Sequence, residues 1–274
     1  MQPIQAILLG VIQGLTEFLP VSSSGHLVLL QNLFGLTEPE VLFDISLHIG
    51  TLMAVCIVFF SEIHSILKTL ISLPGLIKTS GSMKQLYQDN EPVRMATLII
   101  LGSIPTAILG LLFHKMVDQL FGSVRIVGLM LIITGAILWQ TRRFRIKGRP
   151  LIGTTLKDAL VIGLVQGLAI MPGISRSGST ISAALFMGID REVAGRYSFL
   201  LSIPAILGAL VLSLDSPAME TTVSGGMFLM GTLTAGIVGF GALKVLLHIV
   251  NRGRLHFFAP YCWLLGIVAL IVGS

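Results

Sequence analysis

The stretch Pro172-Gly173-Ile174-Ser175-Arg176-Ser177-Gly178 interrupts an apolar segment that runs from residue 158 to residue 188. A second break, Val21-Ser22-Ser23-Ser24-Gly25, divides the apolar residues 3 to 34. Each arm is too short to cross a hydrocarbon core of about 30 Å comfortably, and a Pro/Gly/Ser break frees backbone groups that lipid cannot satisfy. Both segments are therefore predicted to be re-entrant helix-loop-helix hairpins whose tips are buried in protein.

The composition of the whole chain is that of a membrane protein. Of its 274 residues, 54% are hydrophobic and 11% are charged, whereas soluble domains are roughly a quarter charged. Six further apolar blocks are long enough to cross a bilayer as helices, at residues 41–61, 94–113, 122–140, 193–213, 226–249 and 257–273. We expect an all-α integral membrane protein with six transmembrane helices and two hairpins.

The two halves of the chain repeat each other. Residues 10–15 (Gly-Val-Ile-Gln-Gly-Leu) parallel residues 163–168 (Gly-Leu-Val-Gln-Gly-Leu), and Ser22-Ser-Ser-Gly25 parallels Ser175-Arg-Ser-Gly178 at the same offset. Each repeat holds one hairpin and three spans, and a polar stretch near residues 70–92 makes the first repeat longer. Because three is odd, the second repeat starts on the opposite side of the membrane. The sequence predicts one membrane domain, 1–274, built from inverted repeats of about 1–140 and 155–274.

Charge asymmetry gives the orientation of the spans. In this topology Lys115 and Arg125 fall on one side, and the other side receives most of the basic residues: Lys68, Lys78, Lys84, Arg142, Arg143, Arg145, Lys147, Arg149, Lys157, Arg191, Arg252 and Arg254. The positive-inside rule makes the basic side cytoplasmic and places both termini outside. The net charge of +5 is thus explained by topology, and nucleic-acid binding is not expected.

The polar residues of the first hairpin are candidates for chemistry. Gln13 and Glu17 share one helical face, and a carboxylate inside a membrane segment is a functional candidate by default. The turn from Ser22 to His26 sets hydroxyls and an imidazole beside the backbone N–H groups of a helix start, which suits an anion, a nucleophile and an acid or base. The structural alternatives are an interfacial glutamate and a serine-rich helix cap.

In the second hairpin, Arg176 lies between two serines of the break. Its planar guanidinium matches a phosphate, and burying it without an anion would be costly. A purely structural salt bridge to Glu17 is the alternative. Asp44 and His48, at the head of a span, either line the cavity or mark the membrane interface.

The sequence resembles the undecaprenyl-diphosphate phosphatase family, also called bacitracin-resistance proteins. The resemblance is carried by Gln13-Gly-Leu-Thr-Glu17, by Ser22-Ser-Ser-Gly-His26 and by Pro172-Gly-Ile-Ser-Arg-Ser-Gly-Ser-Thr180, and it extends over nearly the whole chain. The first family motif allows Glu or Gln at the first position, so Gln13 removes one charge and any metal would rest mainly on Glu17.

This resemblance implies hydrolysis of undecaprenyl diphosphate to the monophosphate lipid carrier, in the bacterial cytoplasmic membrane, usually with a divalent cation such as Mg²⁺. It also implies tolerance of bacitracin, which sequesters the same lipid. Glu17, Ser23, His26 and Arg176 are then the expected catalytic residues. The expected substrate-binding residues are Gln13, Ser22, Ser24, Gly25, Ser175, Ser177, Gly178 and Thr180. We also expect a homodimer and an active site open to the periplasmic side.

A secondary transporter or flippase of a polyprenyl phosphate is the rival interpretation, since paired broken hairpins in inverted repeats are typical of transporters. A transporter needs a binding site but no serine and histidine beside an arginine. The candidate chemistry therefore favours an enzyme.

Overall fold

The computed structural model describes residues 2–33, 41–80, 82–121, 123–144, 148–214 and 223–273. Within them the only β pairing is a single bridge between Arg149 and Ile189. Five helices are long and apolar enough to cross a membrane, and a bent pair of helices is a sixth candidate. The prediction of an all-α membrane fold is confirmed.

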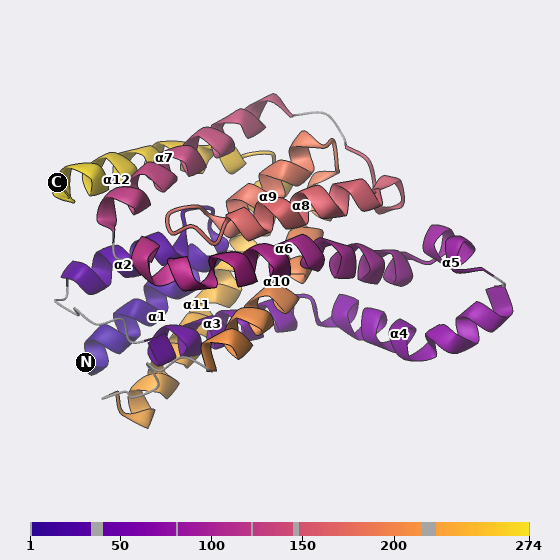
Figure 1. Ribbon diagram of the computed structural model, residues 1–274, viewed down its shortest axis with the longest axis horizontal. Helices are drawn as coiled ribbons and strands as arrows, with labels where there is room; N and C mark the ends of the chain where they lie inside the picture. The colour runs from indigo at the N-terminus through magenta and orange to yellow at the C-terminus, as the bar shows by residue number, and fades with distance from the viewer. Residues whose placement is uncertain are drawn as a thin grey trace.

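The helices run in chain order as α1 (Pro3–Phe18), α2 (Ser23–Leu33), α3 (Val41–Val58), α4 (Phe60–Ser80), α5 (Met83–Asp89), α6 (Glu91–Phe121), α7 (Val124–Gln140), α8 (Leu156–Leu168), α9 (Arg176–Phe186), α10 (Arg191–Leu214), α11 (Gly225–Asn251) and α12 (Ala259–Val272). Both ends of the chain lie at one end of the long axis, and α5 lies at the other (Figure 1). Of the basic residues used to orient the spans, Arg145 and Lys147 lie outside the described residues.

Two helices are interrupted at the predicted breaks. α1 ends at Phe18 before α2 begins at Ser23, and α8 ends at Leu168 before α9 begins at Arg176. The two arms pack together in each case, α1 with α2 and α8 with α9. Both breaks contain a residue in the left-handed region, Ser22 at φ 68° and Gly173 at φ 95°. This conformation is costly for serine, so the packing around the first tip must hold Ser22 in place.

The first predicted span, 41–61, is shorter than expected. α3 ends at Val58, and the chain turns by 80° into α4. Phe59 lies at the bend, 5% exposed, and its ring stacks on Phe199 with 6.2 Å between centroids. The stretch near 70–92 was expected to be a polar connection, but α4 and α5 occupy most of it. The α4 side chains that pack against the core, Ile63 and Ile66, come before this stretch, and Ile71 within it is 83% exposed.

The helix pairs follow a pattern expected of two repeats. α1 and α3 both pack against α11, while α8 and α10 both pack against α6, and α7 packs against α12. Suppose that α1, α2, α3, α6 and α7 correspond to α8, α9, α10, α11 and α12. Exchanging the halves then turns the two pairs with α11 into the two pairs with α6, and turns the α7–α12 pair into itself. The repeat boundaries and their opposite orientation stay predictions.

Glycines of the repeated motif bring these helices close together. A Cβ on Gly10 would lie 2.7 Å from the carbonyl oxygen of Gly231 in α11, and a Cβ on Gly163 would overlap the carbonyl of Gly102 in α6. Helices in membranes associate through such small residues because lipid offers no hydrophobic driving force. The repeated Gly-x-x-x-Gly pattern therefore fixes the first arm of each hairpin against a long helix.

Polarity is arranged from inside to outside. Large apolar side chains face outward, such as Ile237 at 74% exposed and Val272 at 72%, whereas Gln13 is 0% exposed and Glu17 7%. A bilayer can solvate the first group but not the second. The polar residues of the two hairpins are thus enclosed by helices.

Candidate active site

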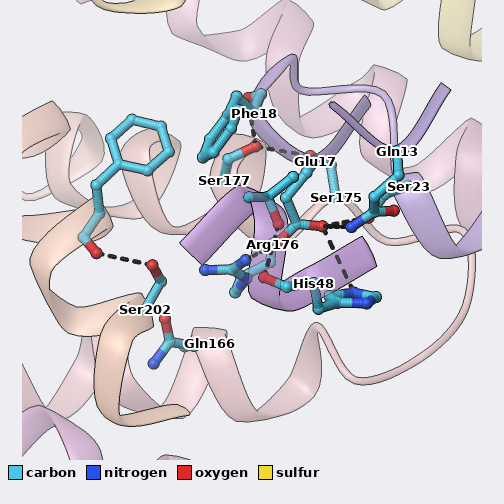
Figure 2. Close-up of polar contacts among 12 residues, drawn as sticks. Gln13, Glu17, Phe18, Ser23, His48, Gln166, Ser175, Arg176, Ser177 and Ser202 are labelled. Carbon is cyan, nitrogen blue, oxygen red and sulfur yellow. Dashed lines mark hydrogen bonds and ion pairs between the residues drawn. The ribbon is translucent and has the colours of Figure 1, made fainter. Parts of the chain in front are cut away.

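The Glu17 carboxylate is the centre of the site (Figure 2). It lies in the last turn of α1, where the break in the helix begins. Its Oε2 atom accepts hydrogen bonds from Ser23 Oγ at 2.6 Å and from Gln13 Nε2 at 3.1 Å. The Oε1 atom pairs with the Arg176 guanidinium. Three such donors offset part of the cost of burying the charge of this carboxylate.

Arg176 comes from the second half of the chain, 159 residues away from Glu17. It is the first residue of α9, where Ser175 is the N-cap. Only one of its terminal nitrogens is held by Glu17, and among the described residues its remaining N–H groups make no hydrogen bond. The structural ion pair considered from the sequence is therefore present, and donors remain for a further anion.

The two hairpin tips contact each other at this point. Ser177 Oγ donates to the Phe18 carbonyl at 2.8 Å, and a Cβ on Gly178 would lie 2.9 Å from Pro20. On the other side, a Cβ on Gly25 would lie 3.4 Å from the Cα of Gly173. Ser23, Glu17 and Arg176 are thus brought together by direct packing of the two breaks.

Several of the predicted substrate-binding serines act as helix caps. Ser22 Oγ accepts from the Gly25 amide at 3.3 Å, and Ser175 Oγ accepts from the Gly178 amide at 3.1 Å. Ser24 lies 3.3 Å from the Ser22 hydroxyl. Such caps satisfy N–H groups that the first turn leaves unpaired. These contacts order the tips, and a direct role for these serines in substrate binding stays a prediction.

Thr180 lies deeper in α9, where its hydroxyl donates to the Arg176 carbonyl at 2.9 Å. The side chain is 1% exposed. The structure therefore places Thr180 beneath Arg176, in contact with its backbone, and its predicted contact with substrate stays a prediction.

His26 is not directed at Ser23. Its Nδ1 lies 2.7 Å from the Ser22 carbonyl oxygen, and its Nε2 lies 2.7 Å from the Tyr261 hydroxyl. A carbonyl oxygen can only accept, so Nδ1 carries a hydrogen and Nε2 accepts from Tyr261. Both ring nitrogens are therefore engaged away from the serine. This arrangement holds the strained Ser22 turn, and the predicted acid or base role of His26 stays untested.

Two residues of the site were missed or left open in the sequence. His48 of α3 lies with its Nε2 3.7 Å from Glu17 Oε2, so it lines the site and does not merely mark an interface. Tyr261 of α12 reaches His26 across 235 residues of sequence. Two polar residues, Asp44 and His48, stand out in an otherwise apolar span, and this pattern could have indicated that His48 lies at the site. No sequence pattern indicated Tyr261.

In the described part of the second repeat, the hairpin has no carboxylate equivalent to Glu17. Gln166 occupies the position corresponding to Gln13, but Ile170 stands where the first repeat has Glu17. The Gln166 amide donates to the Thr106 hydroxyl and to the Leu201 carbonyl, both at 3.3 Å. The second repeat thus contributes Arg176 to a single site instead of forming its own.

The donor atoms near Glu17 fit a divalent cation that has few protein ligands. Gln13 is fully buried, and its Oε1 has no hydrogen-bond partner in the described part of the chain. An orphaned buried acceptor next to a carboxylate calls for a donor or a cation. Over the same residues no group of three or more His, Cys, Asp or Glu side chains could hold a metal. Phosphate oxygens and water would complete such a coordination sphere, as is usual for Mg²⁺.

Comparison with known proteins identifies the family of this chain. Residues 6–268 match the family described as "Bacitracin resistance protein BacA". A protein of Desulfatibacillum aliphaticivorans named undecaprenyl-diphosphatase is 53% identical over 269 residues, which cover 98% of each chain. A protein of the same name from Desulforapulum autotrophicum is 52% identical over 280 residues, or 100% of this chain and 99% of the relative. This chain therefore belongs to the bacitracin resistance protein BacA family.

Proposed function

We propose that this chain hydrolyses undecaprenyl diphosphate to undecaprenyl phosphate and inorganic phosphate at the site formed by Glu17, Ser23 and Arg176. The observation that carries the proposal is the hydrogen bond from Ser23 Oγ to Glu17, 2.6 Å long, with the Arg176 guanidinium on the other carboxylate oxygen. A hydroxyl, a proton acceptor and a phosphate-binding cation thus meet in one place. The identity of the lipid substrate is inferred from the name of the relatives, undecaprenyl-diphosphatase.

The terminal phosphate of the substrate is proposed to lie between the two tips. The unpaired N–H groups of Arg176 bind its oxygens, and the N-terminal ends of α2 and α9 add positive potential at the same point. These groups are fixed before the substrate arrives. They stabilise the charge that develops on the transferring phosphoryl group.

Ser23 then attacks the terminal phosphorus. Its proton passes to Glu17 Oε2, and the bond between the terminal phosphorus and the bridging oxygen breaks to release undecaprenyl phosphate. Water attacks the resulting phosphoserine, which frees inorganic phosphate and restores the hydroxyl. One water is consumed overall. Direct attack by water, oriented by Glu17, gives the same products, and trapping of radiolabelled phosphoserine in acid distinguishes the two routes.

A divalent cation such as Mg²⁺ is proposed as the cofactor, held by Glu17 and Gln13. When bound, it neutralises charge on the diphosphate oxygens. The fit rests on the unpartnered Gln13 oxygen beside the buried carboxylate.

The proposed setting is the bacterial cytoplasmic membrane, with both termini outside and the active site open to the periplasmic side. The excess of basic residues on one side of the spans supports this orientation. Recycling the carrier lipid there would sustain cell-wall synthesis and lower the amount of lipid that bacitracin can sequester. A homodimer also stays a proposal.

The test is release of inorganic phosphate from undecaprenyl diphosphate by the detergent-purified protein. We expect turnover in the wild type and loss of turnover in Glu17→Gln and Arg176→Ala. Detergent removes the compartments that transport needs, so a pure transporter or flippase of a polyprenyl phosphate would release none. Absence of phosphate release from folded wild-type protein would refute the proposed hydrolysis.

A further inference from the structure

We propose that His48 is a metal ligand and that it completes, with Glu17 and Gln13, a divalent-cation site containing one nitrogen donor. The inference rests on the proposed function in one respect, because it concerns the divalent cation proposed for that reaction. It specifies where this cation binds and which side chains are its ligands. No motif in the sequence assigns His48 to the site.

The tautomer of His48 suits a ligand. Its Nδ1 lies 2.9 Å from the carbonyl oxygen of Asp44, one turn earlier in α3. Because a carbonyl oxygen only accepts, the hydrogen of the neutral ring is on Nδ1 and the lone pair of Nε2 is free. Metal-bound histidines usually donate their other ring N–H to a carbonyl or carboxylate in this way. The free nitrogen faces Glu17.

The spacing between the two side chains also suits a shared cation. Nε2 of His48 and Oε2 of Glu17 are 3.7 Å apart, which is too long for a hydrogen bond. Two ligands on one small divalent cation, each at about 2.0 to 2.2 Å, lie roughly 3.0 to 3.6 Å from each other. The side chain of His48 is 33% exposed. A small movement of the His48 ring would therefore bring the two ligand atoms to the spacing that a shared cation needs. Because the ring is partly exposed, an ion can reach it.

Gln13 supplies the third donor. Its Nε2 now donates to Glu17 Oε2 at 3.1 Å, while its buried Oε1 has no partner among the described residues. Rotation of the amide would turn Oε1 towards the carboxylate, an arrangement that is repulsive unless a cation lies between the oxygens. A cation would thus replace the amide on Oε2, and Ser23 would keep its own hydrogen bond to that atom.

A nitrogen ligand has consequences for which ion binds. Carboxylate and amide oxygens suit Mg²⁺, whereas an imidazole favours Mn²⁺, Co²⁺ and Zn²⁺ in the Irving–Williams order. His48 should therefore shift the preference of this site towards these transition metals. Replacing it with an oxygen donor should shift the preference back towards Mg²⁺.

The experiment is pulsed electron paramagnetic resonance of the full-length protein in detergent, loaded with one equivalent of Mn²⁺ after removal of any polyhistidine tag. Electron spin echo modulation detects a ¹⁴N nucleus bonded to Mn²⁺. We expect the nitrogen signal in the wild type, its loss in His48→Gln, and a Mn²⁺ affinity at least ~10-fold weaker in that variant. His248→Gln, in the last turn of α11, is the matched control and should keep the signal.

His48→Asp provides a second variant in case the amide side chain perturbs folding. It should bind Mn²⁺ without a nitrogen signal and should raise the affinity for Mg²⁺ relative to Mn²⁺. Circular dichroism and gel filtration in the same detergent verify that each variant is folded.

The outcomes separate this inference from the proposed function. Nitrogen coupling that persists in His48→Gln, or Mn²⁺ binding without coupling in an active wild type, overturns the role of His48 and leaves the phosphatase intact. Mn²⁺ binding without nitrogen coupling is the result expected if His48 is instead an imidazolium paired with Glu17. If the protein binds no Mn²⁺ and releases phosphate at the full rate in the presence of a chelator, the proposed cation site is wrong. Nitrogen coupling in a protein that releases no phosphate would uphold the metal site and refute the reaction.

Discussion

Replacement of Arg176 by lysine should be nearly as damaging as its replacement by alanine. In the structure one terminal nitrogen of Arg176 is held by Glu17 Oε1, so in the proposed complex the phosphate is bound by the other donors of the same planar group. An ammonium has its three donors at a single point on a differently shaped side chain, and it cannot hold the carboxylate and two phosphoryl oxygens in the same geometry. Geometry, more than charge, should decide the outcome.

The magnitude follows from one lost contact. Removing a charge-assisted hydrogen bond that acts in the transition state costs on the order of 2 to 4 kcal/mol, which is roughly a 30- to 1,000-fold loss in rate. The assay is phosphate release at saturating lipid, after each variant has been shown to insert and fold. Arg125→Lys is the matched control, because Arg125 is exposed and, among the described residues, its side chain hydrogen-bonds to the Gly273 carbonyl alone, at 2.7 Å. It should keep wild-type turnover.

The reasoning would be refuted if Arg176→Lys retained more than about a third of wild-type kcat, since that corresponds to a loss below ~1 kcal/mol. Arg176 would then be a long-range electrostatic attractor, or the partner that only holds Glu17 in place.

Four further predictions follow from particular contacts. Ser23→Ala should lower kcat far more than it raises KM, because Arg176 and the helix ends still bind the lipid; an effect confined to KM would assign Ser23 to binding. Tyr261→Phe removes the hydroxyl that His26 accepts from at 2.7 Å, and it should reduce turnover by roughly 2- to 12-fold, the equivalent of one neutral hydrogen bond of about 0.5 to 1.5 kcal/mol; unchanged turnover would show that this bond does not position the tip. Gly163→Ala overpacks α8 against Gly102 and should destabilise the protein by about 1 to 3 kcal/mol in detergent unfolding, whereas Gly75→Ala, with open space around the added Cβ, should not. A cysteine at position 145 should resist an impermeant thiol reagent on intact cells when Cys56 and Cys262 are replaced by serine, and strong labelling there would reverse the orientation.

The local sequence predicted the elements of this fold well because the bilayer limits what a backbone can do. Apolar length indicated the spanning helices, and the Pro/Gly/Ser runs indicated where α1 and α8 stop, since neither signal depends on distant residues. The bend after Val58 was missed. It depends on Phe59 packing against Phe199 of α10, a contact that no local pattern reveals.

Part of the candidate site could likewise be predicted from the local sequence. Glu17, Ser23 and Arg176 stood out because a polar or charged side chain inside an apolar segment is expensive, and the structure brings all three together. The grouping of Gln13 with Glu17 followed from helical spacing, and their 3.1 Å hydrogen bond confirms that shared face.

The sequence by itself determined that the chain is a helical membrane protein, where its helices break and which polar residues it buries. Only the tertiary structure decided which of these residues meet. His26 follows Ser23 closely in sequence but bonds to Tyr261 of α12, whereas His48, from another helix, faces Glu17. The physical reason is that membrane insertion depends on composition along the chain, while the direction of a side chain depends on packing between helices distant in sequence.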